Sequence, residues 1–351
     1  MKRLHPGHPG CSGLASGCRA AIVAAAGCCV AAAGERAYEA PRWEVVPQDG
    51  HQAVFEHDGE EWVGWHFGGQ YPRPFFYPFR GPSGESLTRM GHPGAPNHDH
   101  HRSIWFAHQK VNGVDFWSDD TAARIRQKLW QVYEDGAEEA VMAVQLGWYD
   151  GEGKELMEQD LVAAARSGRD GARELEIQIL IRPPAGAAGV DLGKTNFGLL
   201  AVRVAKSLSA HFGGGTLTNS EGAEGEAAIF GKPARWVDYS GPVATGTGGE
   251  RRVVTEGITY FDHPDNPRHP VSWHVRVDGW MGAAFFLNEG LRIAAGESLE
   301  LRYLLAAHAG GHDPQRAAET AAAFAARRGF SVTKSTRPHR QFDIARRPAG
   351  R

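Results

Sequence analysis

Five of the 17 histidines lie between His92 and His108, in a segment bounded by proline and glycine. The segment contains arginine and tryptophan, and it continues through Asn112, Asp115 and Trp117. Imidazole groups titrate near neutral pH and bind metal ions in their neutral form. Indole rings offer flat apolar faces on which a sugar ring can stack. The segment therefore indicates proton transfer, metal binding or sugar recognition.

The histidines of this segment support more than one chemistry. If residues 97–106 form a strand, His98 and His100 lie on one face and His101 on the other. A His-x-His pair on one face can bind a divalent metal, with a carboxylate or a third histidine completing the site, and the candidate ligands are His98, His100 and His101. In the alternative, one imidazole is a general acid or base, and Arg102 holds a substrate carboxylate or an oxyanion. In a third interpretation, these side chains only cap loops.

A second polar group lies in residues 257–276, where three prolines predict a rigid loop between two strands. His274 and Arg276 are expected on one face of the following strand, and Trp273 on the other. Asp262 and Asn266 also suit a purely structural turn. The candidate functional residues of this group are Asp262, His263, Asn266, His269, Trp273, His274 and Arg276.

Other motifs exclude several classes of protein. The polar turns at residues 194–196, 219–222 and 236–239 assign no role by themselves. The sequence has no P-loop, no dinucleotide-binding glycine pattern and no Gly-x-Ser-x-Gly nucleophile elbow. A net charge of −3 provides no basic field for nucleic acid. Ten tryptophans, several beside histidine or aspartate, favour carbohydrate binding, although most are expected in the core.

The elements that must position these side chains are short strands separated by turn residues. Strands are expected at residues 61–67, 124–133, 140–148, 156–164, 173–181, 197–204, 227–230, 234–239, 257–261, 271–277 and 298–305. Asp150-Gly151 predicts a type I′ hairpin turn. Residues 71–101 read as a long loop whose aromatic side chains indicate ordered packing.

About a dozen strands without alternating helices predict an all-β fold, a large antiparallel β-sandwich. We expect a single domain over residues 41–330, which ends with a short C-terminal helix at residues 314–328 behind the N-cap Asp313. Residues 331–351 are basic and are expected to form a disordered tail. Hydrophobic residues make up 42% of the chain, which is enough for a large core.

Residues 1–33 have the pattern of a signal peptide. Basic residues precede an apolar run at residues 20–33, which is too short for a membrane span and ends in a small-residue cleavage motif. All four cysteines lie within this segment, so the mature chain is expected to lack disulfides. We therefore expect export to the periplasm or the medium. Cys28 follows a degenerate lipobox, which makes a lipoprotein the alternative.

Several strings of the sequence resemble a known family. They are residues 100–108 (HHRSIWFAH), 111–117 (VNGVDFW), 219–220, 236–239, 262–264, 266–270 and 273–276. They resemble the soluble bacterial PmoA-like domain family, and the resemblance covers about residues 71–312. Members of that family commonly occur beside sugar oxidoreductases and glycoside-degrading proteins, so the resemblance implies carbohydrate chemistry. It also implies a galactose-mutarotase-like supersandwich, whose enzymes often use a histidine and a carboxylate on a concave sheet.

One departure from the family pattern concerns a turn. The family tends to carry an acidic residue after a Gly-Asp-Thr-type turn, and residues 192–198 read Leu-Gly-Lys-Thr-Asn-Phe-Gly here. This departure puts a catalytic carboxylate at that turn in doubt.

These observations predict an exported carbohydrate-active enzyme: a lyase, epimerase or hydrolase acting on a sugar, a uronate or a modified glycoside. The expected catalytic set, facing one another across a concave sheet, is His100, His101, Arg102, His108, His263 and His274. One histidine would be the acid or base, and Arg102 would neutralise developing negative charge.

The substrate-binding candidates, with Trp105 or Trp117 stacked on the sugar ring, are Trp105, Asn112, Asp115, Trp117, Asp262, Asn266, His269, Trp273 and Arg276. Two alternatives remain. The first is a metal-dependent oxidoreductase that uses the histidine cluster as ligands. The second is a non-catalytic carbohydrate-binding module.

Overall fold

A computed structural model of the protein describes residues 39–92, 94–95 and 98–348, and the fold below is that of residues 41–348. The expected signal peptide, the four cysteines and the lipobox at Cys28 lie outside the described residues. No helix in the described part of the chain is long and apolar enough to cross a membrane.

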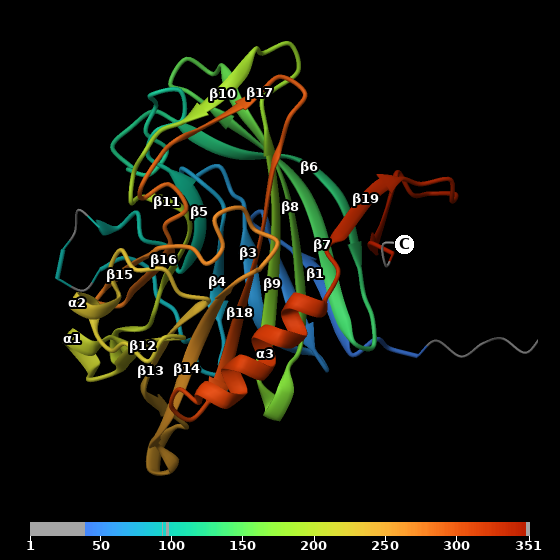
Figure 1. Ribbon diagram of the computed structural model, residues 1–351. Coiled ribbons are helices and arrows are strands. Elements are labelled where there is room, and N and C mark those ends of the chain that lie inside the picture. Colours follow the sequence, from blue (N-terminus) through green and yellow to red (C-terminus); the bar gives the residue numbers. More distant parts are fainter. Residues whose placement is uncertain (1–38, 93, 96–97, 349–351) are drawn as a thin grey trace, which may run out of the picture. The chain divides into compact units, whose positions relative to one another are not determined.

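Two eight-stranded antiparallel sheets form the fold, which confirms the all-β sandwich expected from the sequence (Figure 1). The first sheet has, in spatial order, β1 (Trp43–Gln48), β2 (Gln52–His57), β3 (Glu60–His66), β4 (Phe75–Phe79), β5 (Ile104–His108), β11 (Gly198–Arg203), β16 (Trp280–Ala283) and β15 (Trp273–Arg276). The second has β12 (Thr216–Asn219), β13 (Trp236–Thr245), β14 (Arg252–Asp262), β18 (Leu299–Ala309), β9 (Arg173–Arg182), β8 (Glu155–Ser167), β7 (Glu139–Tyr149) and β6 (Arg124–Glu134).

Smaller elements complete the described chain. Two two-stranded sheets pair β10 (Gly189–Leu192) with β17 (Leu291–Ala294), and β19 (Phe330–Lys334) with β20 (Phe342–Arg346). The helices are α1 (Ala210–Gly213), α2 (Glu226–Ile229) and α3 (Pro314–Ala326). Short 3-10 turns occur at Arg169–Gly171, Lys206–Leu208 and Gly248–Glu250.

The alternation of side chains along the strands separates the core from the outer faces. Ile104 and Phe106 of β5 belong to the main core between the sheets, where Tyr260 of β14 packs against Trp273 of β15 with ring centroids 4.8 Å apart. Trp105 lies between these two core residues in sequence, and it belongs to a separate apolar cluster on the outer face of the first sheet. The outer face of this sheet is therefore also lined with large side chains.

Helix α3 covers part of the outer face of the second sheet (Figure 1). The carboxylate of Asp313 accepts hydrogen bonds from the backbone N–H groups of Gln315 and Arg316, so Asp313 is the N-cap that the sequence predicts. Ala317 and Phe324 are buried against side chains of β13, β14 and β18. The spacing of these residues, seven apart, places both on the same face of the helix.

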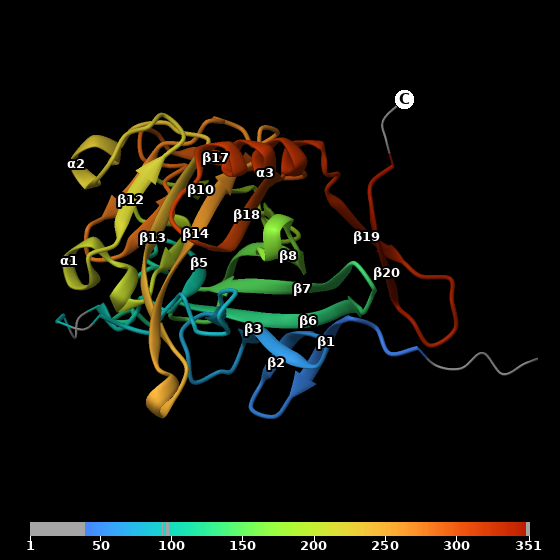
Figure 2. The same cartoon turned by 90° about the horizontal axis from the view of Figure 1, so that it is seen from below.

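The expectation of a disordered tail after residue 330 is wrong. The segment forms the hairpin of β19 and β20, seen at the right of Figure 2. Its apolar residues Phe330, Val332, Phe342 and Ile344 pack on the outer face of β6, β7 and β8. Arg346 at the end of the hairpin pairs with Glu139 and Glu176 of the sheet. The basic residues therefore bind carboxylates of the second sheet, which composition alone does not reveal.

Two local expectations also fail. Residues 227–230 do not form a strand: α2 occupies most of this range, because alanine favours a helical turn and the turn buries Ile229. The hairpin between β7 and β8 is present, but its loop spans residues 150–154 rather than two residues of a type I′ turn. The carboxylate of Asp150 accepts from the backbone of Glu152 and Lys154, and Gly153 takes the positive φ of 84°.

Candidate active site on the outer face of the first sheet

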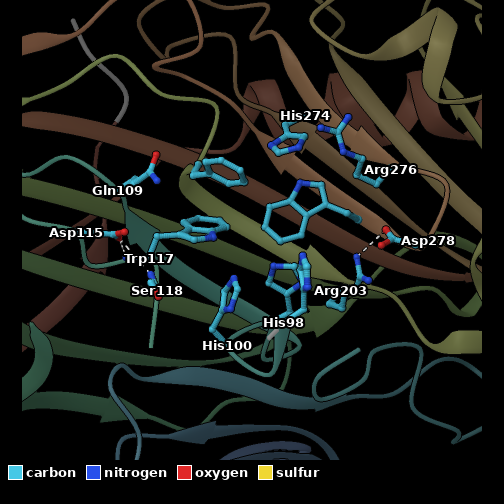
Figure 3. A pocket seen from close by; sticks show the side chains of 13 residues that line it. His98, His100, Gln109, Asp115, Trp117, Ser118, Arg203, His274, Arg276 and Asp278 are labelled. Carbon is cyan, nitrogen blue, oxygen red and sulfur yellow. Dashed lines mark hydrogen bonds and ion pairs between the residues drawn. The ribbon is translucent and has the colours of Figure 1, made fainter. Parts of the chain in front are cut away.

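A cavity of about 360 Å³ lies on the outer face of the first sheet (Figure 3). Its walls come from the segment before β5, the loop after β5, and strands β11, β15 and β16. The lining residues are His98, His100, His101, Gln109, Asp115, Trp117, Ser118, Phe197, Arg203, His274, Arg276, Asp278 and Trp280. The cavity thus brings together side chains that are far apart in the sequence.

Three buried indole rings form the base of the cavity. The ring centroids of Trp105, Trp117 and Trp280 lie 5.1–5.6 Å apart, and Trp117 and Trp280 face the cavity. The indole N–H of each has no hydrogen-bond partner among the described residues. A ligand in the cavity would therefore meet the apolar faces of Trp117 and Trp280, while the indole N–H groups are buried.

His98, His100 and His101 lie on a turn, not on the strand considered for residues 97–106. The backbone N–H of His101 donates to the carbonyl of His98 at 3.0 Å, and β5 begins only at Ile104. The turn places all three rings at the cavity, with centroids 4.3–5.7 Å apart. A strand would have sent His101 to the opposite face.

His101 is the most deeply buried of these three histidines, with 6% of its surface exposed. Its ring stacks on Trp105 at 5.4 Å and packs against Trp280 at 4.8 Å. Burial, with a smaller contribution from nearby His100 and Arg203, lowers the pKa of His101 far below its ordinary value. The imidazole is therefore neutral at physiological pH.

His274 faces the cavity from β15, on the side opposite His98 and His100 in Figure 3. Its Nδ1 lies 2.9 Å from the carbonyl oxygen of Asn196, which can only accept, so Nδ1 carries the proton and Nε2 the lone pair. Burial lowers the pKa of His274 to about 4, although the hydrogen bond to Asn196 opposes this shift. His274 is thus a neutral imidazole with a fixed tautomer.

A buried charge cluster lies beside the histidines. Arg203, only 1% exposed, donates from Nη1 to Asp278 at 2.9 Å. His92 Nε2 lies 2.9 Å from the other carboxylate oxygen of Asp278. Burial alone would raise the pKa of Asp278, but the bonds to Arg203 and His92 hold it below its ordinary value. Asp278 is therefore charged and fixes the position of Arg203.

A family model for a family of unknown function (DUF6807) matches residues 52–322 of the 351. The chain belongs to this family. The matched range runs from β2 into α3 and includes every residue that lines the cavity. No curated protein matches the sequence.

In this DUF6807 chain, seven of the residues proposed from sequence line the cavity: His98, His100, His101, Asp115, Trp117, His274 and Arg276. The expected alternation along β15 is confirmed, since Trp273 lies in the core between the sheets. Trp105 lies directly beneath His101 rather than at the cavity surface.

Arg102 does not line the cavity, contrary to expectation. Its guanidinium pairs with Asp119 at 2.5 Å and lies over the ring of Tyr71. Asp119 also pairs with the buried Arg73 at 3.0 Å, so this arginine pair holds the loop after β5 in place. The cationic side chains that line the cavity are instead Arg203 and Arg276.

The expectation that His108 and His263 face His274 is wrong. His108 Nε2 donates to the carbonyl of Gly193, and its ring packs against Phe286. His263 follows β14 in the second sheet, and its ring packs against Phe324 of α3. Both side chains are fully buried away from the cavity.

The rest of the 262–270 segment is a structural turn, which was the alternative for Asp262 and Asn266. The carboxylate of Asp262 accepts from Asn266 Nδ2, from the backbone of Val271 and from His269 Nδ1. Asn266 also bonds to the backbone of Arg302 in β18. These three proposed residues therefore stabilise the loop and do not reach the cavity.

The side chains of Asn112 and Asp115 also accept hydrogen bonds from backbone N–H groups. Asn112 Oδ1 accepts from the backbone N–H of Asp191 in β10, away from the cavity. Asp115 lines the cavity, and its Oδ1 accepts from the backbone of Trp117 at 2.6 Å and of Ser118 at 3.2 Å. Asp115 thus holds the backbone of the loop at Trp117.

The proposed metal-ligand set is not formed. Within residues 39–92, 94–95 and 98–348, no three His, Cys, Asp or Glu side chains are placed to hold one metal ion. The rings of His98, His100 and His101 instead contact one another by their faces and edges.

Sequence reasoning missed several lining residues, namely Gln109, Ser118, Phe197, Arg203, Asp278 and Trp280. Arg203 had a signal, because it is a single charge within the apolar run Leu199-Leu-Ala-Val-Arg-Val-Ala205. A charge inside a strand that is otherwise buried requires a partner or a function. Asp278 had none, since Asp278-Gly279 reads as an ordinary turn.

Proposed function

We propose that this protein is a carbohydrate-active enzyme, a lyase, epimerase or hydrolase, in which a histidine transfers a proton to or from a bound sugar. The observation that carries the proposal is the combination of two indole faces, Trp117 and Trp280, with the neutral His274 in one cavity (Figure 3). Its volume of about 360 Å³ lies at the lower end of the range for small-molecule sites and suits a sugar of one ring.

His274 is the proposed base, because its tautomer is set by the protein. With Nδ1–H donating to Asn196, the lone pair of Nε2 is available to take a proton. The pKa of about 4 means that His274 is unprotonated at neutral pH. Its conjugate acid, once formed, returns the proton readily to an intermediate or a leaving group.

The other lining groups suit the binding of a sugar. Trp117 and Trp280 provide surfaces for the C–H face of the ring, and Gln109 can bond to hydroxyl groups. Arg203 provides a fixed positive charge for an oxyanion that develops during proton transfer. The segment containing His98 and His100 closes the other side of the site (Figure 3).

The test is a screen of the purified protein on glycosides and their 3-keto derivatives, with sugar binding followed by tryptophan fluorescence. We expect turnover in the wild type and a loss of about 10²- to 10⁴-fold in His274→Gln, with sugar binding retained. His339→Gln, at an exposed histidine of the β19–β20 loop, is the control and is expected to keep full activity. Binding without turnover in the wild type would identify a binding module, and equal turnover in His274→Gln would remove His274 as the base.

We also propose that the protein is a relative of the PmoA-like proteins and is exported, as the pattern of residues 1–33 supports. Sequencing of the mature N-terminus from the periplasm and medium tests the export. The expected result is a start near residue 34. An intact chain found only in the cytoplasm would contradict it.

A further inference from the structure

We propose that the cavity binds the carboxylate of an acidic sugar and that Arg203 is the residue that holds this carboxylate. The inference rests on the proposed function and specifies its substrate class. It assigns to Arg203 a binding role beyond its ion pair with Asp278.

The inference depends on the edge of the Arg203 guanidinium that is formed by Nε and Nη2. Arg203 lies on β11 with 1% of its surface exposed, and it lines the cavity. Only Nη1 is bonded, to Asp278 (Figure 3), while Nε and Nη2 are buried and have no partner in the described part of the chain. Nε–H and Nη2–H point in parallel along one edge of the guanidinium plane, which matches the two oxygens of a carboxylate.

The other buried side-chain atoms around the cavity that lack a hydrogen-bond partner in the described chain are also nitrogens. They are the indole Nε1 atoms of Trp117 and Trp280 and the Nδ1 atom of His101. Among the described lining residues, no buried oxygen lacks a partner. The indole and guanidinium nitrogens among them only donate, which suits a carboxylate, an acceptor with no hydrogen of its own to place.

The charges next to Arg203 favour an anion as well. Arg89 Nη2 donates to the backbone carbonyl of Asp278 at 2.7 Å, and its guanidinium lies near that of Arg203. Burial, together with the charge of Arg203, lowers the pKa of Arg89 to about 10, so it remains charged at neutral pH. In the described structure, the carboxylate of Asp278 pairs with Arg203, and no carboxylate pairs with Arg89, which bonds to the backbone carbonyl of Asp278. A ligand carboxylate would balance the second positive charge.

The test compares matched sugars by titration calorimetry. The probes are methyl glucuronide and methyl galacturonide, the corresponding neutral methyl glucoside and methyl galactoside, and the uronamides, which keep the shape of the acids without the charge. We expect the full-length wild type to bind at least one acid about 10- to 100-fold more tightly than both its neutral sugar and its amide. Equal affinity for acid, neutral sugar and amide would overturn the inference and leave the proposed function standing.

Variants test whether Arg203 causes the tighter binding of the acidic sugar. Arg203→Lys keeps a cation beside Asp278 but removes the parallel pair of donors, so we expect it to lose about 10- to 100-fold in affinity for the acid and less than about threefold for the neutral sugar. Arg182→Lys, at an ion pair of β9 with Asp160 that is not part of the cavity lining, is the matched control and is expected to keep the preference. An acid preference that survives in Arg203→Lys would refute the role of Arg203.

A probe without hydroxyls separates the two proposals. Cyclohexanecarboxylate carries the carboxylate on a six-membered ring that is not a sugar. If it binds in a manner that depends on Arg203 while no sugar binds, the carboxylate site is supported and the proposed carbohydrate function fails. If neither the acids nor cyclohexanecarboxylate bind, the inference fails. The wild-type comparison of acid and amide gives the answer even if Arg203→Lys does not fold.

Discussion

Glu176 provides the most direct test of how the C-terminal segment is held to the sandwich. Its carboxylate, on β9, is fully buried and accepts from Arg302 of β18 at 2.7 Å and from Arg346 of β20 at 3.0 Å. Arg327, at the end of α3, donates to it at 3.2 Å. Glu176→Gln keeps the shape of the side chain but removes the one charge that these three guanidinium groups share.

The burial of this carboxylate sets the loss of stability, as free energy of unfolding, that we expect for Glu176→Gln. Breaking a buried ion pair by neutralising one partner costs about 3–5 kcal/mol, and here Arg302 would stay buried without a carboxylate, whereas Arg346 and Arg327 keep Glu139 and Glu174. At about 2 °C per kcal/mol for a domain of this size, the melting temperature should fall by roughly 6–10 °C at pH 7. Glu319→Gln, at the exposed pair with Arg169, is the control and should change stability by less than about 0.5 kcal/mol.

The difference in melting temperature between wild type and Glu176→Gln should depend on pH in a defined direction. Burial alone would raise the pKa of Glu176, but Arg346 and Arg302 lower it below its ordinary value. A carboxyl whose pKa is depressed by folding stabilises the protein above its unfolded pKa of about 4.3, and this contribution is lost as the pH falls through the folded value. Thermal melts of wild type and Glu176→Gln should therefore differ fully at pH 7 and converge in acid.

Thermal unfolding followed by circular dichroism at pH 7 and at pH 3–4 measures both effects. A melting temperature of Glu176→Gln within about 2 °C of the wild type at pH 7 would refute the reasoning, because it would mean that the three guanidinium groups do not depend on this carboxylate. A difference that grows in acid would refute the sign of the pKa shift.

Three further predictions concern the site and the hairpin. In the pH profile of kcat/KM, the acidic limb should be half-maximal near pH 4, because protonation of His274 removes the base; a midpoint near 6.5 would contradict this. Trp280→Ala should weaken sugar binding about 10-fold or more in fluorescence titrations, whereas Trp62→Phe in the core should leave affinity unchanged. Deletion of residues 329–351 should lower the melting temperature by several degrees by exposing Val132, Val141 and Val162; an unchanged melt would show that the hairpin adds no stability.

The long strands of the second sheet could be predicted because their own sequences, and the turn residues between them, are typical of strands. Strands β7, β8 and β9 are each ten or more residues long, and turn residues separate them. Helix α3 was equally clear, because Asp313 and Pro314 mark its start. The short strands β4, β5 and β16 were not identified as strands from sequence alone. Each has four or five residues and depends on its neighbours in the sheet.

About half of the site could be predicted, and the limit was the pairing of distant residues. The density of histidines at residues 98–101 marked the site, and the period of two along β15 placed His274 and Arg276 correctly. Sequence spacing does not show that Asp278 meets Arg203, 75 residues earlier, across neighbouring strands. Nor does it show that the loop after β14 turns toward α3, which removes His263 from the site.

Proton transfer by His274 to or from a sugar in this cavity can be followed by proton NMR in D₂O. Uronides and 3-keto glycosides are incubated with wild type and with His274→Gln, and spectra are recorded over time. Lyase, epimerase and hydrolase reactions each change the signals of the ring or of the anomeric proton. If His274 is the base, the wild type should convert at least one sugar or exchange its protons for deuterium, and His274→Gln should do neither. Unchanged spectra with the wild type, or equal conversion by both proteins, would contradict this role of His274.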